Sequence, residues 1–150
     1  MKNLAWLKGL IFGILSSLFS AWLVMFFGQI LADGLMSFWG ELWLYYAVII
    51  PFAIAFTILG VYFDKNEVTN KKRWMISLLC AFFVTWFSGT IGAIFGEAIV
   101  RGGLDTLPIE DVLIWGTIYA FILLPITIFY ARFLVEFLYH IIRPELKVSS

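Results

Sequence analysis

The chain has 150 residues, of which 63% are hydrophobic, 19% are aromatic and only 13% are charged. Soluble domains carry charges on about a quarter of their residues, so this composition excludes a soluble domain and predicts an integral membrane protein. The formal net charge is zero at pH 7, because ten basic residues balance ten acidic ones.

Four apolar runs are long enough to cross a hydrocarbon core of about 30 Å, which takes about 20 helical residues. No run contains Asp, Glu, Lys or His. We expect each run to be a helix, because the bilayer offers backbone groups no water and the runs lack the alternation of barrel strands. The predicted fold class is an all-α integral membrane protein, one compact four-helix domain with spans at Gly9 to Ala32, Trp43 to Phe63, Trp74 to Gly96 and Val112 to Arg132.

The first run follows Lys2 and Lys8 and contains small residues, as a secretory signal does. It continues through WLVMFFGQILA, which is too long for the apolar core of a cleaved signal, so we expect a retained helix. Small residues recur in it at every fourth position. They are Gly9, Gly13, Ser17 and Ala21.

The same run contains Gln29, whose amide needs several hydrogen-bond partners and therefore favours the bundle interior or an interface. Hydroxyls make up the other polar side chains of the spans. Bonds to the preceding helical turn or to a neighbouring helix account for most of them.

The second and fourth runs each contain a proline, Pro51 in IIPFAIAF and Pro125 in LLPITIFY, and each favours a kink. The first and third runs also match, SLFSAWLVMFF against SLLCAFFVTWF. These matches indicate a tandem duplication of a two-helix hairpin, with both copies in one orientation. Chance similarity within a restricted composition is the alternative.

The third run repeats the small-residue spacing of the first. Between helices in lipid there is little hydrophobic driving force, so small side chains matter because they let backbones approach. We expect the first and third spans to cross closely at the centre of the bundle, although the same surfaces would also suit a partner's helix. The third-span residues of this helix-packing surface are Ser77, Ala81, Thr85, Gly89, Gly92 and Gly96.

Two pairs of opposite charge stand at span ends, Glu97 with Arg101 and Arg132 with Glu136. A spacing of four residues puts both members on one helix face, where a solvated pair contributes a few tenths of a kcal/mol. We interpret both pairs as markers of the membrane boundary in preference to functional groups.

The segment FYARFLVEFLYHII extends the fourth helix to about residue 142, beyond what the bilayer requires, until Pro144 stops it. It is rich in aromatic residues, so we expect it to lie along the membrane interface or to dock on a partner. Aromatic residues near span ends are interpreted as interfacial anchors. They include Trp6, Trp39, Trp43, Trp74 and Tyr139.

The basic residues indicate the orientation. With a cytoplasmic N-terminus, nine of the ten Lys and Arg residues fall on the cytoplasmic side, and only Arg101 falls outside. The positive-inside rule then makes both termini cytoplasmic in the plasma (cell inner) membrane. Topology and anionic lipid explain the basic edge, so we assign it no nucleic-acid role. The acidic residues on the outer side are Asp33, Glu41, Glu97, Asp105, Glu110 and Asp111.

Chemical motifs are missing from the sequence. Cys80 and His140 are the only residues of their types, and no phosphate-binding loop, nucleophile elbow or HExxH pattern occurs. The spans also lack the acidic residue or His that proton-coupled transporters usually carry. We therefore predict no catalytic residue, no metal site and no cofactor.

Three functions remain open. The leading hypothesis is a non-enzymatic interaction protein, such as an accessory subunit, assembly factor or immunity-type protein, that contacts the lipid bilayer and either another membrane protein or a second copy of itself. The alternative is a small homo-oligomeric channel or transporter for a cation or small solute. The third is a lipid-headgroup enzyme that uses Glu97, Arg101 and the neighbouring acidic residues.

Overall fold

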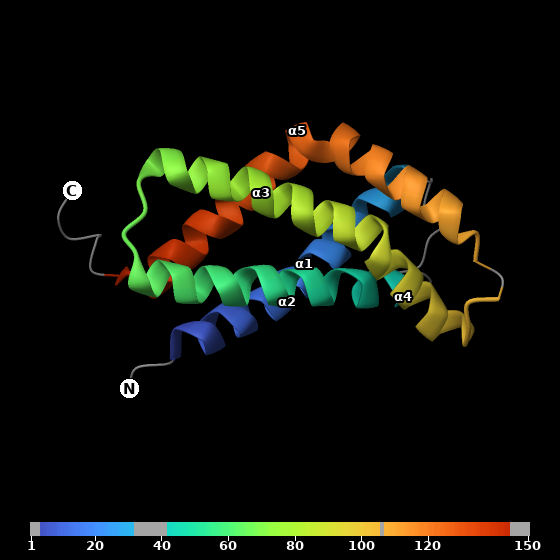
Figure 1. Ribbon diagram of the computed structural model, residues 1–150, viewed down its shortest axis with the longest axis horizontal. Helices are drawn as coiled ribbons and strands as arrows, with labels where there is room; N and C mark the ends of the chain where they lie inside the picture. The colour runs from blue at the N-terminus through green and yellow to red at the C-terminus, as the bar shows by residue number, and fades with distance from the viewer. Residues whose placement is uncertain (1–3, 32–41, 106, 145–150) are drawn as a thin grey trace.

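The computed structural model describes residues 4–31, 42–105 and 107–144, and these form five α-helices (Figure 1). The helices are α1 (Leu4–Leu31), α2 (Leu42–Lys65), α3 (Asn70–Gly89), α4 (Ile91–Arg101) and α5 (Ile109–Ile142). Taken with α4, α3 makes one of four segments that are long and apolar enough to cross a membrane. The prediction of four long apolar helices in a packed bundle is confirmed, and the chain is a multi-pass membrane protein by these criteria.

The two ends of the bundle differ in charge. We call the end where α1 begins and α5 finishes the basic end, and the opposite end, which holds α4, the acidic end (Figure 1). The connection from α2 to α3 brings Lys65, Lys71 and Lys72 to the basic end. At the acidic end, Glu110 and Asp111 occupy the first turn of α5, where they complement the helix dipole. Asp33 and Glu41 lie outside the described residues.

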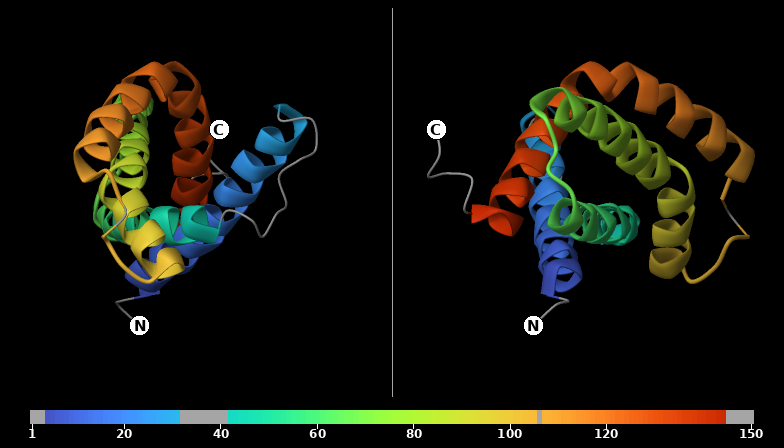
Figure 2. Two further views of the ribbon diagram at one scale, coloured as in Figure 1. Left: turned by 90° about the vertical axis from the view of Figure 1, so that its right-hand side faces the viewer. Right: turned by 60° about the vertical axis from the view of Figure 1, so that its left-hand side comes forward.

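The third span is not the single helix that we predicted. Thr90 has φ −116° and ψ −93°, outside the helical region, and its N–H bonds to the Phe87 carbonyl oxygen at 3.3 Å. Its hydroxyl donates to the Trp86 carbonyl oxygen at 2.6 Å and so takes an acceptor of the preceding turn. The helix resumes at Ile91 in a new direction, and Figure 2 shows α4 turning away from α3.

The prediction that the first and third spans cross at the centre was wrong. Within the described ranges α1 makes no backbone contact with α3; α1 packs mainly on α2, and α3 packs mainly on α5. Both α2 and α5 contact each of the other four helices, and α2 makes the more extensive contacts. Small residues indicate that backbones approach closely, but they do not indicate which helix is the partner.

The contact between α1 and α2 depends on glycines. A Cβ atom at Gly9 or Gly13 would collide with the backbone oxygen of Phe56 or Phe52 on α2. Gly60 of α2 completes the contact, because a Cβ there would lie 3.1 Å from the Cα atom of Gly9. The sequence interpretation missed Gly60, which has no small residue four positions away on either side. The other two members of the α1 stripe, Ser17 and Ala21, are fully buried.

The glycines of the third span serve two different partners. Before the break, Gly89 lies against Gly116 of α5, a residue that the sequence interpretation did not select. After the break, Gly92 and Gly96 lie against the backbone oxygens of Ala47 and Trp43 on α2. The change of direction at Thr90 is therefore what turns α4 onto α2.

The buried core lies toward the basic end, where Phe56, Phe63 and Leu138 are almost inaccessible. Tyr139 belongs to this core with 4% of its surface exposed, so its interpretation as an interfacial anchor was wrong. Trp6 and Trp74 are exposed, as an anchor requires, and Trp39 lies outside the described residues.

Candidate functional site

A group of arginines joins the helices at the basic end. Glu136 Oε2 lies 2.5 Å from Arg132 Nη1, the pair expected from spacing, and 2.9 Å from Arg73 Nε of α3. The other carboxylate oxygen lies 3.2 Å from His140 Nε2. One carboxylate of α5 therefore holds the first turn of α3, a partner 63 residues away that helical spacing cannot reveal.

The guanidinium groups of Arg73 and Arg132 have further partners. Arg73 Nη1 donates to the Val68 carbonyl oxygen at 2.7 Å, and its Cζ lies 4.6 Å from the centre of the Tyr139 ring. Arg132 Nη2 donates to Asn70 Oδ1 at 2.5 Å, and its Cζ lies 5.2 Å from the Trp74 ring. These hydrogen bonds and cation–π contacts fix the connection between α2 and α3 against α5.

Arg143 ties the end of α5 to the end of α2. Its Nε donates to the Phe63 carbonyl oxygen at 2.7 Å, and its Nη2 donates to the Asp64 carbonyl oxygen at 3.3 Å. The last carbonyls of a helix lack helical partners, so these bonds satisfy groups that would otherwise be unpaired. We call Arg73, Arg132, Glu136 and Arg143 the arginine cluster; its contacts are those of a structural clamp.

The acidic end holds the second predicted pair. Glu97 Oε2 lies 2.5 Å from Arg101 Nε within α4, and the arginine side chain is 54% exposed. A pair of this exposure contributes little stability. Gln29 lies half-buried near the end of α1.

A cavity of about 440 Å³ lies between four helices, and we take it as the candidate functional site. Its walls come from residues 20–27 of α1, 44–56 of α2, 80–88 of α3 and 123–134 of α5. The helices α1 and α3, expected to touch, instead face each other across this space. Of the predicted packing residues, Ala81 and Thr85 line it.

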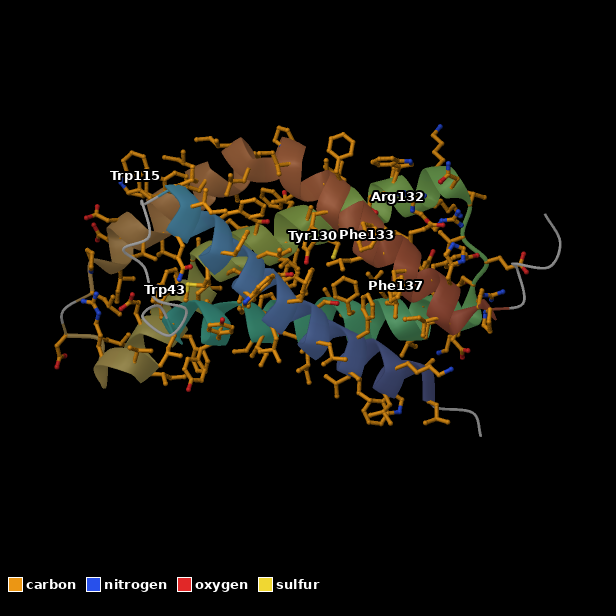
Figure 3. All side chains as sticks on the ribbon, turned by 180° about the vertical axis from the view of Figure 1, so that it is seen from behind. Trp43, Trp115, Tyr130, Arg132, Phe133 and Phe137 are labelled. Carbon is orange, nitrogen blue, oxygen red and sulfur yellow. The ribbon has the colours of Figure 1, made fainter. Side chains whose placement is uncertain are left out.

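The cavity is closed toward the basic end. Ser20 Oγ and Tyr130 Oη form a hydrogen bond of 2.7 Å that joins α1 to α5. Beyond it, the ring of Phe12 packs on Phe56 and on Phe137, with centroids 5.2 Å and 5.8 Å apart. Figure 3 shows this stretch of α5 beside α1, with Tyr130 and Phe137 labelled.

The cavity lining is apolar with a few hydroxyls. None of the lining residues is charged. Thr127 donates to the Leu124 carbonyl oxygen at 3.3 Å, whereas Ser88 Oγ is buried and has no hydrogen-bond partner among the described residues. Such a site suits an apolar guest that carries at most a few hydrogen-bonding groups.

Sequence reasoning missed the cavity as such. Its hydroxyls at Ser20, Thr85 and Ser88 are visible in the sequence, but empty space arises only from how four helices are placed.

In the part of the chain that the structure describes, no three His, Cys, Asp or Glu side chains lie where they could hold a metal ion. Comparisons with protein-family models, with curated proteins and with solved structures find no match.

Proposed function

We propose that the chain is a non-enzymatic membrane interaction protein, an accessory subunit, assembly factor or immunity-type protein that binds another membrane protein through a helix face. A row of large side chains on α5 carries this proposal, and we call it the α5 stripe. Its members are 54% to 70% exposed in the isolated chain. They are Trp115, Tyr119, Ile122, Ile126, Phe129, Phe133 and Phe137.

The spacing of the α5 stripe supports a helix as its partner. Successive members stand three or four residues apart, so they form one narrow line along most of the helix. A line of apolar residues at this spacing is the seam that two helices share in a coiled coil. Five of the seven members are aromatic, and aromatic residues are enriched in protein interfaces.

A photo-crosslinking amino acid in place of Phe133 tests the proposal in native membranes. We expect a discrete adduct with a second protein, because the α5 stripe would be covered by the partner. The same replacement at Ile58, which is 62% exposed on α2, is the matched control and should react with lipid alone. Ile126 also borders the cavity and is unsuitable for this experiment.

Two outcomes would change the proposal. An adduct with a second copy of the chain would favour the homo-oligomeric channel or transporter, which a flux measurement in vesicles then tests. Lipid adducts at both positions would overturn the proposed partner interaction.

We also propose that the basic end faces the cytoplasm and that the membrane is the plasma membrane. The described basic residues other than Arg101 lie toward the basic end, which is the cytoplasmic end under the positive-inside rule. In a Cys80→Ser background, single cysteines at Lys72 and Asp105 test the orientation with an impermeant maleimide. Intact cells should label position 105 alone, and the reverse pattern would invert the topology.

A further inference from the structure

The dimensions of the cavity restrict its occupant. On α2 the lining runs from Leu44 to Phe56, about 18 Å along a helix axis, which is a little more than half of a hydrocarbon core of about 30 Å. The cavity volume of about 440 Å³ lies within the range of about 300–1,000 Å³ that small-molecule sites have.

A single hydrocarbon chain fits this space. Carbon atoms in contact stand about 4 Å apart, so an extended chain has a cross-section of roughly 20 Å², and about 18 Å of it occupies roughly 360 Å³. Because the lining carries no charge, a hydrated ion or polar solute would lose its hydration without compensation. The bilayer around the protein supplies hydrocarbon chains at high concentration, and a filled cavity gains dispersion contacts that an empty one lacks.

Two hydroxyl sites at different depths fix the direction of such a chain. At the closed end, Ser20 and Tyr130 satisfy each other and need no ligand. Ser88 stands at the opposite limit of the α3 lining, toward the acidic end, and its buried Oγ has no partner among the described residues. An ester carbonyl at the head of an acyl chain is an acceptor that this hydroxyl lacks.

We propose that the cavity binds one acyl chain of an ester-linked bilayer lipid from the leaflet at the acidic end. The chain lies between α1 and α3 with its tip against Phe56 and Leu134, and Ser88 donates to the ester carbonyl. The bound chain occupies the space between α1 and α3. This site shares only Ile126 with the α5 stripe, and lipid binding in the cavity does not require a partner on the stripe.

The test uses vesicles of phosphatidylcholine in which one acyl chain carries a terminal diazirine. After irradiation, peptide mapping should find the label on Phe56, although its side chain is only 1% exposed, in preference to Ile58 at 62% on the same helix. Labelling of Phe56 that does not exceed labelling of Ile58 would overturn the proposal, because it would mean that no chain enters.

Variants then locate the site. Thr85→Trp fills the cavity and should lower labelling of Phe56 about tenfold, as expected from displacing about two methylene groups. Leu79→Trp, at a lipid-facing position of the same helix that is 63% exposed, is the matched control and should leave labelling unchanged. Ser88→Ala adds no bulk and should lower labelling severalfold through the lost hydrogen bond. Unchanged labelling in folded Thr85→Trp protein, or a protein adduct at Phe56, would contradict the proposal.

Discussion

The two ends of the bundle are held together in different ways. At the basic end, the arginine cluster joins side chains of α3 and α5 to each other, and it binds backbone oxygens of α2 and of the segment between α2 and α3. The glycine contact between α1 and α2 adds to it. At the acidic end, α4 packs on α2 and α3 packs on α5 through glycines, while α1 is separated from α3 by the cavity.

The difference follows from where charge is tolerated. Guanidinium and carboxylate groups are stable at the membrane boundary when they are paired, and there they join distant segments with directional bonds. Between the described helices inside the bilayer, close backbone approach, hydroxyl bonds and packed aromatic rings take the place of ion pairs, and all of these depend on shape. Because directional bonds join the helices mainly at the basic end, the other half of the bundle has room for a cavity.

The largest expected effect comes from breaking the contact that holds α1. Gly9→Leu must push α1 away from the Phe56 carbonyl, so we expect a loss of about 3 kcal/mol or failure to fold. Thermal unfolding in detergent measures it. Gly103→Leu is the control, because a Cβ there meets nothing within 4 Å. Equal unfolding temperatures for the two variants would disprove the glycine contact.

Neutralising one carboxylate at each end compares the ends directly. Glu136→Gln leaves Arg73 and Arg132, which are 16% and 15% exposed, without their shared partner, and should cost about 2 kcal/mol. Glu97→Gln removes a single exposed pair and should cost less than about 0.5 kcal/mol. The difference in unfolding temperature is the measurement, and similar losses at both ends would refute the comparison.

An effect about as small as that of Glu97→Gln is expected where the half of the bundle that holds the arginine cluster meets the half that holds the cavity. Tyr130→Phe removes the hydrogen bond to Ser20 and should lower stability by about 0.6 kcal/mol, the average for such bonds between membrane helices. Tyr119→Phe, at an exposed position of the same helix, is the control for loss of a hydroxyl. A loss above about 2 kcal/mol would mean that this bond holds α1 as firmly as the glycines do.

Much of the secondary structure could be predicted, because the length and apolarity of each span are properties of one segment. The break at Thr90 could not, since the stripe of small residues continues through it at the spacing of a straight helix. Its cause is local but subtle, a threonine after Gly89 with no proline nearby. Because of the break, Gly92 and Gly96 pack on α2.

In the candidate sites, too, the features that belong to one segment could be predicted from the sequence, and those that depend on the assembled fold could not. Arg132 with Glu136 is visible as a spacing of four, yet Arg73 joins them only after α3 has folded back beside α5. Gly60 has no small residue four positions away, and both Gly60 and Gly116 matter because of the backbone opposite them. The cavity depends on the relative positions of four helices and on no single segment.

The arginine cluster also has a consequence for the order in which the protein is assembled. The glycine contact between α1 and α2 involves two consecutive helices and can form while the ribosome is still producing α3. Glu136 and Arg143, in contrast, belong to α5 and to the residue that follows it, and they bind segments made more than sixty residues earlier. The clamp therefore forms only after α5 has been made, and until then Arg73 lies at the membrane boundary without its carboxylate partner.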